Sequence, residues 1–544
     1  MVMNPVIINE SKWLNYFFNF FHFESPTSFM VFAGFVVLGL LVVGNFVSAF
    51  ATWIKIKFVW RKNHELSNSL LRKYVFMPYA YFLNHNTASL SKNVLMEVNQ
   101  LTSGYILPLV NIFTGGVTAF VILTVLLYVN LLMTLVAAVV LISMYLSVYL
   151  YFSERIRTGG ELRLKTNKER FRLAGEALGG VKDIKILGVE KYFLDRYSKH
   201  SGIFSEVHSR NQIIGQIPRY IMEVVAFGGI VGLMIFSVSL NMSNQKVIPL
   251  VSFFAFAGYR LMPALQELFN ALTTMRFNKA VLDKIHKDIL ENGRTDVAKF
   301  VNRNKISPLP FKKNIKLDNV SFCYPNNAKN VLDNITMSIE KNTFVAIIGT
   351  TGAGKTTLVD LMLGLLSPSE GFLKVDEAEI NEESVKNWQA NLGYVPQQIF
   401  LTDDTVASNI AFGVPAKEID LDRLKESARM ANIHDFVDSE LPNRYDTVIG
   451  ERGIRLSGGQ KQRIGIARAL YHDPEILLFD EATSSLDNAT EKEVLRAIEN
   501  VAKTKTMIVI AHRLTTVKNC DKVYVVEKGM IIKEGSYDEI VRKV

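Results

Sequence analysis

Cysteine is almost absent from this sequence. Only Cys323 and Cys520 occur in 544 residues, far apart and without a CxxC spacing. This scarcity excludes a disulfide-stapled fold, argues against a zinc site, and fits two thiols in a reducing cytosol. Because no cysteine precedes Cys323, an N-terminal cysteine protease domain is excluded as well.

Acidic residues are scarce in the first half of the chain. Residues 1–290 hold 28 Lys and Arg against 16 Asp and Glu, whereas the remainder holds 33 against 36. The formal net charge of +9 is therefore concentrated in one half, which is also the apolar half. The positive-inside rule produces such a surplus in membrane proteins, so we attribute it to topology and not to nucleic-acid binding.

Five apolar runs are each long enough to cross a bilayer, which takes about 20 helical residues. The segments between them alternate in character. Two are very short, whereas residues 51–104 and 153–219 are long and rich in Lys and Arg, which predicts that the long ones lie in the cytosol. The predicted spans are residues 28–50, 105–127, 131–152, 220–240 and 247–271.

The odd number of spans would leave the two ends of the chain on opposite sides of the membrane. The opening residues, Met1 to Pro5, have neither the basic stretch nor the apolar core of a signal peptide. We therefore expect that a first span is missing from this chain. The alternative is an unusual protein with five spans.

Residues 12–23 combine a polar and an apolar face at helical spacing. We expect an external amphipathic helix in the headgroup layer, either as an anchor or as a guide for the lipid tails of a substrate. The polar face holds Lys12, Asn15, Asn19 and His22, and the apolar face holds Trp13, Leu14, Phe17, Phe18 and Phe21.

One arginine, Arg260, falls inside a predicted span. An arginine in the bilayer is costly unless it faces a cavity or a partner. Its planar fork suits a phosphate or pyrophosphate, which makes Arg260 a candidate substrate contact. The alternative is an internal salt bridge to Glu223 or Glu267. Arg219 and Glu223, four residues apart, are predicted to form a local ion pair.

The pattern changes near residue 310. Short β-branched runs alternate with helical segments, which predicts an α/β domain with a largely parallel sheet over residues 314–544. Residues 291–313 are polar and contain glycine and proline, as expected of a linker. Residues 1–290 are then the membrane domain.

Residues 349–356 read GTTGAGKT, follow an apolar strand and precede a helical segment. This is the P-loop, or Walker A, pattern in its required setting. The glycines let backbone N–H groups surround phosphates at a helix N-terminus. Lys355 adds a positive charge, and the Thr356 hydroxyl can coordinate Mg²⁺.

A second apolar strand, residues 476–480, ends in Asp480 and is followed by Glu481. This Walker B arrangement places Asp480 near a bound Mg²⁺, and Glu481 can act as the general base that activates water. The alternative is a pair of acids that merely cap the next helix, and the P-loop upstream argues against it.

Residues 456–460 read LSGGQ and precede a helical segment. This string resembles the signature sequence of ABC-type ATPases, and the surrounding motifs follow that family's order. Tyr324 resembles the aromatic residue that stacks on adenine, Gln397 the Q-loop glutamine, and His512 the switch histidine at the γ-phosphate. Residues 485–487 resemble the D-loop, and residues 450–453 resemble a loop characteristic of exporters.

The resemblance implies an ATP hydrolase that uses ATP and Mg²⁺. The implied catalytic residues are Glu481, His512, Gln397 and Lys355, and the implied Mg²⁺ ligands are Thr356, Gln397 and Asp480. The implied nucleotide-binding residues are Tyr324, Gly349, Thr350, Thr351, Gly352, Ala353, Gly354, Lys355, Thr356, Thr357, Gln397, Ser457, Gly458, Gly459, Gln460 and Asp487.

In this family the signature closes over ATP bound to the P-loop of a second subunit. All motifs are intact here, which favours a homodimer with two competent sites. The resemblance also places coupling helices, which carry motion to the spans, near residues 78–90 and 187–198.

The membrane half most resembles bacterial flippases of lipid-linked oligosaccharides, on residues 259–263 (YRLMP), residues 217–223 (IPRYIME) and the external helix. The fold implied is an α-helical transmembrane domain of the ABC exporter type, with five spans here and six in the family, followed by an α/β P-loop ABC ATPase domain. The function implied is alternating-access export of a lipid-linked oligosaccharide, or another amphipathic glycolipid, from the cytosolic to the outer side of a bacterial inner membrane.

Two other functions share the same ATPase chemistry. One is a multidrug or lipid exporter of the same fold, and the other is an ATP-gated regulatory or channel-like ABC protein. An apolar cavity would favour the exporter of drugs or lipids, which would not need Arg260. The intact Glu481 and His512 argue for turnover and against a gated pore.

Overall fold

The computed structural model describes residues 12–239, 244–290, 307–325, 329–450, 453–481, 496, 504–511 and 517–541. The chain divides into two compact units. The helical unit comprises Met1–Met77 and Asn84–Thr295, and the α/β unit comprises Pro78–Leu83 and Asp296–Val544.

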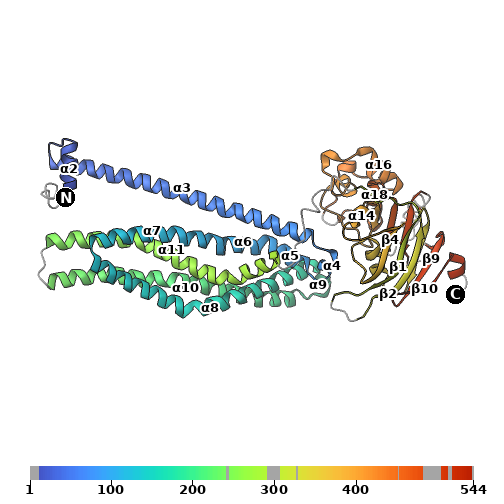
Figure 1. Cartoon of the computed structure of the whole chain (residues 1–544), viewed down its shortest axis with the longest axis horizontal. Coiled ribbons are helices and arrows are strands. Elements are labelled where there is room, and N and C mark those ends of the chain that lie inside the picture. The colour runs from blue at the N-terminus through green and yellow to red at the C-terminus, as the bar shows by residue number, and fades with distance from the viewer. Residues whose placement is uncertain are drawn as a thin grey trace. The chain divides into compact units, whose positions relative to one another are not determined.

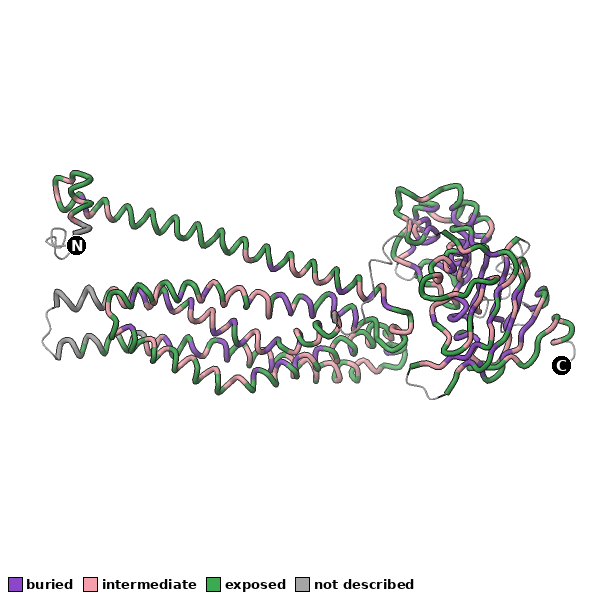
Figure 2. The backbone as a smooth tube through the Cα atoms, in the orientation of Figure 1, coloured by how far each residue is buried: buried purple, intermediate pink, exposed green. Residues whose placement is uncertain are grey.

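The helical unit is built from helices longer than a bilayer requires. The longest, such as α3 (Pro26–Val75, 50 residues), reach about 75 Å at about 1.5 Å per residue, against a hydrocarbon core of about 30 Å. Helices α7, α8, α10 and α11 pack side by side, whereas the apolar part of α3 is exposed (Figures 1 and 2). The other helices of this unit are α2 (Lys12–Phe20), α5 (Thr87–Lys92), η1 (Asn93–Glu97), α6 (Val98–Leu101), η2 (Thr102–Ile106), α7 (Leu107–Val129), α8 (Leu131–Gly179), α9 (Val181–Leu187), α10 (Glu190–Ser239) and α11 (Asn244–Leu290).

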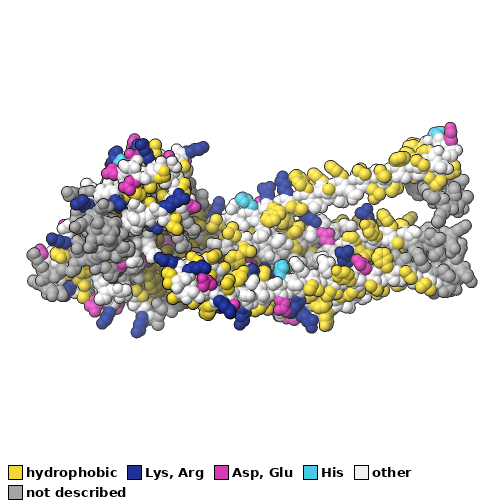
Figure 3. Space-filling model, turned by 180° about the vertical axis from the view of Figure 1, so that it is seen from behind, with side chains coloured by type: hydrophobic (Ala, Val, Ile, Leu, Met, Phe, Trp, Pro, Cys, Tyr) yellow, Lys and Arg dark blue, Asp and Glu magenta, His cyan; other side chains and the backbone are white. Residues whose placement is uncertain are grey.

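Each predicted span falls inside this set of helices, except that residue 240 lies outside the described residues. Within the described part of the chain, three helical stretches are long and apolar enough to cross a membrane: Pro26–Val75, Thr87–Val129 and Leu131–Gly179. Hydrophobic side chains cover much of this unit, and Lys and Arg gather toward one end of it (Figure 3). This separation of apolar and basic surface is the one that the positive-inside rule predicts.

The expected amphipathic helix corresponds to α2, which covers most of residues 12–23. Its aromatic residues pack on the start of α3. The ring centroids of Phe18 and Phe29 are 5.6 Å apart, and those of Phe21 and Phe32 are 5.3 Å apart. Several of these rings remain exposed, as expected of a helix with an apolar face toward lipid.

The crossing of α8 and α11 depends on one glycine. A Cβ added at Gly160 would lie 2.0 Å from the carbonyl oxygen of Phe277. Phe277 is itself buried against Ile156, Val207 and Ile214. The two helices therefore approach too closely for any side chain at position 160.

Short helix α4 (Tyr79–Leu83) lies between α3 and α5 in the sequence but clusters with the α/β unit. Ala80 packs against the buried core of that unit, and burial raises the pKa of Tyr79, with a smaller contribution from Asp360. This helix occupies the first of the two segments in which coupling helices were expected.

Within the second expected coupling segment, residues 187–198, all of which are described, the structure has the end of α9 and the start of α10, and no separate short helix. Helix α9 (Val181–Leu187) ends because Gly188 adopts the left-handed conformation with φ of +63°. Helix α10 already begins at Glu190.

The α/β unit contains two sheets. The six-stranded sheet has the order β10-β9-β3-β8-β7-β6 and is parallel except for β10. Its inner strands are continuous buried runs, as expected of a parallel sheet covered on both faces. The second sheet is antiparallel, with the order β2-β1-β4-β5. The strands are β1 (Asn314–Phe322), β2 (Leu332–Glu340), β3 (Phe344–Gly349), β4 (Glu370–Val375), β5 (Ala378–Glu379), β6 (Leu392–Val395), β7 (Ile476–Asp480), β8 (Thr506–Ile510), β9 (Lys522–Glu527) and β10 (Met530–Gly535).

Helices pack against these sheets around two buried cores. They are α13 (Lys355–Met362), α14 (Val385–Gln389), α15 (Val406–Ile410), η4 (Ala416–Glu418), α16 (Leu421–Met430), α17 (His434–Ser439), η5 (Arg444–Asp446), α18 (Gly458–Tyr471) and α21 (Tyr537–Val541).

The last part of the predicted linker belongs to the α/β unit. Phe311 is buried in its core, and the backbone N–H of Leu309 donates to the carbonyl of Asn387 at 3.0 Å. Residues 291–306 of the predicted linker lie outside the described residues.

Arg468 of α18 joins this helix to the segment around α15. Its Nη1 donates to the Phe400 carbonyl at 2.7 Å, and its Nε donates to the carbonyl of the fully buried Asn409 at 2.8 Å. The Asn409 side chain in turn accepts from the backbone N–H of Thr402 at 3.0 Å. Burial lowers the pKa of Arg468 to about 10, and the guanidinium still donates to three oxygens. Residues 400–410 and α18 are thus held as one piece.

We expect Gly160→Ala to lower the stability of the folded protein by about 1–3 kcal/mol, because the added methyl group overpacks the α8–α11 crossing. Gly159→Ala is the matched control, since a Cβ at that position meets Val207 Cγ1 at an ordinary 3.5 Å. Thermal unfolding of the two variants in detergent measures the difference. Equal midpoints would contradict the packing described.

We expect Arg468→Lys to destabilise the protein by about 3 kcal/mol, because an ammonium cannot reach the three oxygens that the guanidinium fork holds. Arg463→Lys on the same helix is the control, where Nη1 donates to the Asn432 carbonyl at 2.8 Å. Calorimetry of the full chain compares them. A smaller effect at position 468 than at position 463 would be inconsistent with this role of Arg468.

Candidate functional site

The phosphate loop runs from the end of β3 to the start of α13. Gly352 and Gly354 adopt positive φ angles of +82° and +100°, which L side chains rarely do. A Cβ at Gly354 would also lie 2.8 Å from Leu332 Cδ2. The loop therefore needs glycine at this position for both conformation and space.

Lys355 is the first residue of α13 and is buried. Its Nζ donates to the loop carbonyls of Gly349 at 2.9 Å and Thr350 at 3.0 Å. Burial lowers the pKa of Lys355, while Glu481 and Asp480 act in the opposite direction. The structure thus brings the lysine and the two carboxylates of the sequence prediction into one electrostatic neighbourhood.

The two carboxylates stand at the end of β7. Asp480 is buried, and Glu481 adopts a left-handed φ of +49°, which is unusual for a residue other than glycine. The Nε2 of Gln397 donates to Glu481 Oε2 at 2.7 Å. Gln397 and Glu481 are 84 residues apart in the sequence, and this contact brings two of the expected catalytic residues together.

Tyr324 lies beside α13. Its hydroxyl is 3.0 Å from the Thr357 hydroxyl, and its ring meets Phe322 edge to face with centroids 4.9 Å apart. Thr357 is buried, and its hydroxyl is hydrogen-bonded to that of Tyr324.

Asp360 is a buried carboxylate of this region that the sequence analysis did not single out. Burial, and secondarily the nearby Asp480, raises the pKa of Asp360 to about 6. Burial also raises the pKa of Tyr394, which donates a hydrogen bond to Asp480. The only sequence signal for Asp360 is an acidic residue within the apolar helix α13.

The signature residues begin α18. Ser457 Oγ accepts from the Gln460 backbone N–H at 3.2 Å, and Gln460 Oε1 accepts from the Ser457 N–H at 2.8 Å. This reciprocal capping box fixes the start of the helix. Among the described residues, no hydrogen bond joins the signature to the phosphate loop. The predicted residues Asp487 and His512 lie outside the described residues.

The arrangement fits a nucleoside triphosphate with Mg²⁺. Glycines at a helix N-terminus and a lysine suit phosphate oxygens. The hydroxyl, carboxylate and amide oxygens of Thr356, Asp480 and Gln397 are the ligands that a hard cation prefers.

The helical unit forms a partly open cavity of about 1300 Å³ among α7, α8, α10 and α11. Its lining is mostly aliphatic and aromatic, with polar contributions that include Asn111, Gln266 and Tyr259. The charged residues of the lining are Arg219, Glu223 and Glu267.

The cavity lining holds a different arginine from the one that the sequence singled out. Arg260 is exposed and is absent from the lining, whereas Arg219 is part of it. The alternative partners proposed for Arg260 are paired elsewhere. Glu223 accepts from Arg219 Nε at 3.2 Å, which confirms the predicted local pair, and Glu267 lies 3.5 Å from Lys55 Nζ. Hydropathy located the span but not the face of the helix on which each arginine lies.

Comparison with known proteins supports both halves. Residues 4–263 match the family model of the ABC transporter transmembrane region, and residues 332–484 match that of the ABC transporter. The chain is 30% identical to the heterocyst differentiation ATP-binding protein HepA of Nostoc sp. over 514 residues, covering 91% of this chain and 81% of the relative. It is 30% identical to an ATP-dependent lipid A-core flippase of Cupriavidus metallidurans, covering 88% and 81%.

A solved structure agrees with the fold. The structure of a bacterial Atm1-family ABC exporter with ATP bound superimposes with a TM-score of 0.77 at 25% identity, covering 96% of this chain and 90% of that one. The transmembrane region and the ATP-binding domain therefore lie in one polypeptide in the exporter arrangement. The chain belongs to the ABC transporter family, as an exporter-type protein that hydrolyses ATP to drive transport.

Proposed function

We propose that this protein works as a homodimer in a bacterial inner membrane and moves an amphipathic glycolipid, such as a lipid-linked oligosaccharide, from the cytosolic to the outer side by alternating access. The observation that supports this class of substrate is the cavity of about 1300 Å³. Its lining is mostly apolar and is charged at Arg219 and Glu223. Such a cavity suits a molecule with lipid tails and a phosphorylated head. It is also larger than the pockets of about 300–1,000 Å³ typical of drug-sized ligands.

Arg219 replaces Arg260 as the proposed head-group contact. In the described part of the chain, only its Nε is used, toward Glu223. The two Nη groups can then donate as a fork to a phosphate oxygen pair.

The ATP site is proposed to act through the residues that the sequence singled out. Lys355 and the glycine loop would hold the phosphates, and Thr356, Asp480 and Gln397 would hold Mg²⁺, which offsets phosphate charge when bound. Glu481 would take a proton from the attacking water, oriented by its hydrogen bond to Gln397. His512, Asp487 and the signature of the second subunit would complete each site.

A second candidate is a lipid or multidrug exporter without a glycan head. It is favoured by the apolar lining and by the exposed position of Arg260 outside the cavity. Several relatives are named lipid A-core flippases, which is compatible with either candidate.

We expect Glu481→Gln to reduce the rate of ATP hydrolysis by about 10²–10⁴-fold, because the amide cannot accept the proton of the attacking water. ATP binding should persist, since the phosphate loop is unchanged. Phosphate release and binding of a fluorescent ATP analogue measure the two properties separately. Retained hydrolysis would contradict the role of Glu481.

We expect Arg219→Ala to slow the ATP-dependent movement of a fluorescent lipid-linked oligosaccharide between leaflets of proteoliposomes by about ten- to a hundredfold, the effect of losing a hydrogen bond between charged groups. Arg260→Ala is the matched control and should transport at nearly the parental rate.

Each other outcome of this experiment has a definite meaning. If Arg260→Ala is slow and Arg219→Ala is not, the head group does not bind in this cavity. If no glycolipid moves although ATP is hydrolysed, a parallel assay with a fluorescent phospholipid and a cationic dye tests the second candidate.

A further inference from the structure

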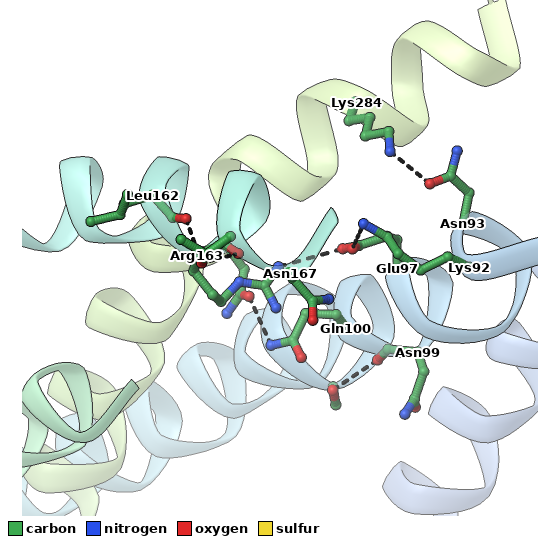
Figure 4. A network of polar contacts seen from close by, with 12 residues as sticks. Lys92, Asn93, Glu97, Asn99, Gln100, Leu162, Arg163, Asn167 and Lys284 are labelled. Atoms are coloured by element: carbon green, nitrogen blue, oxygen red, sulfur yellow. Dashed lines mark hydrogen bonds and ion pairs between the residues drawn. The ribbon is translucent and has the colours of Figure 1, made fainter. Parts of the chain in front are cut away.

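Three charged side chains are buried together at one place in the helical unit. Lys92, Glu97 and Arg163 retain only 3%, 1% and 3% of their exposure. Glu97 Oε1 lies 2.9 Å from Lys92 Nζ, and Glu97 Oε2 lies 3.4 Å from Arg163 Nη2 (Figure 4). We call this set the ionic junction. It joins η1 to α8, across 66 residues of sequence, and neither the ATP site nor the substrate cavity uses it.

The ionic junction lies on a helical segment whose backbone is distorted. In both η1 and η2 the backbone forms π-type bonds, from Val98 N–H to Asn93 and from Leu107 N–H to Thr102. A π turn holds one residue more than an α turn, so its loss would rotate the flanking helix by about 100°. The π turns therefore determine whether Glu97 points at Arg163.

Side chains of neighbouring helices hold the π turns in place. From α3, Ser67 Oγ donates to the Val94 carbonyl at 3.2 Å, and Asn63 donates to Thr102 Oγ1 at 2.7 Å. From α11, Lys284 Nζ donates to Asn93 Oδ1 at 2.6 Å. The junction is thus the point at which α3, α8 and α11 are fastened to the segment 92–106.

The charge of the junction is unbalanced. One carboxylate faces two cations, and Arg163 Nε has no hydrogen-bond partner among the described residues. Burying such charges costs several kcal/mol per ion, and the attraction within the cluster offsets that cost only in part. Water would restore the solvation, which offsets part of the free energy lost when these helices separate. An apolar cluster of the same size would strongly favour the packed arrangement.

We propose that the ionic junction is a conformational switch of the helix bundle, in which segment 92–106 separates from α8 and the charges hydrate during the transport cycle. The inference rests on the alternating-access transport proposed above. Residues 92–104 fall in a segment that the sequence places in the cytosol, where water can reach them. Residues that can pack in two discrete arrangements convert a small change at one site into a large rearrangement.

Hydrogen exchange of peptides covering residues 92–106 tests the switch in the full-length protein in lipid nanodiscs. We expect the unmodified protein to exchange at different rates in the nucleotide-free and the ATP–vanadate states. Glu97→Gln, which leaves two buried cations without their carboxylate, should raise nucleotide-free exchange by about a hundredfold or more.

An all-apolar variant separates a switch from mere packing. Lys92→Met, Glu97→Met and Arg163→Met together should preserve the melting temperature. The proposal expects this triple variant to remain protected in both nucleotide states and to lose stimulation of ATP hydrolysis by substrate. Basal hydrolysis should remain, because the ATP site is intact. This variant also keeps the test decisive if Glu97→Gln fails to fold.

The chain offers a matched control of identical composition. On α3, Glu65 pairs with Arg61 at 3.1 Å and Lys62 at 2.6 Å, but all three side chains are exposed. Replacing these three residues by Gln should leave exchange and stimulation within about twofold, since exposed ion pairs contribute little.

A triple Met variant that keeps both the exchange difference and the stimulation would overturn the switch. Exchange of Glu97→Gln within about twofold of the unmodified protein would overturn it as well. If the unmodified protein moves no lipid, the proposed function fails. The nucleotide-free hydrogen exchange of Glu97→Gln still tests whether the ionic junction holds segment 92–106 in place.

Discussion

Every backbone polar group inside a bilayer must find its partner within the protein, because the hydrocarbon supplies none. The helical unit meets this constraint with helices that continue unbroken for 47–50 residues and pass far beyond the apolar region. Such rods are stiff along their axes, so a displacement at one end of a helix is transmitted to its other end. The short helices α4 and α9 lie between these rods in the sequence, and α4 belongs to the α/β unit, where Ala80 packs against the core. The same constraint that permits membrane crossing therefore also makes these helices stiff.

Within this framework, charged side chains gather at three places. The ATP site assembles its charges at the carboxyl ends of parallel strands, where β3 and β7 deliver Lys355 and Asp480 to one edge of the sheet. The membrane cavity keeps its charged side chains to Arg219, Glu223 and Glu267. The ionic junction buries three more charges in the bundle, outside both sites. Charges that are expensive to bury mark the three places at which this molecule is expected to change state.

The sequence predicted the features that depend on local pattern. The phosphate loop before α13 and the two carboxylates at the end of β7 follow from motifs whose spacing reflects their chemistry. One of the two very short segments between the predicted spans, at Asn130, is a turn in the structure, where the Asn130 side chain caps α8 by accepting from Met133 N–H at 3.0 Å. Features that depend on orientation or on distant contacts were not predictable. Hydropathy could not show that Arg219 faces the cavity and Arg260 does not, and no pattern joins Glu97 to Arg163. The break at Gly188, which ends α9, was not predicted because a single glycine carries no periodic signal.

The central claim is that ATP hydrolysis in the α/β unit is coupled to the movement of an amphipathic glycolipid through the helical unit. The most direct measurement is the steady-state rate of ATP hydrolysis by the purified protein in nanodiscs, as a function of the concentration of a lipid-linked oligosaccharide. The account predicts a saturable rise above the basal rate, which a free oligosaccharide without its lipid does not produce. A rate that is independent of the glycolipid at every concentration would contradict the account.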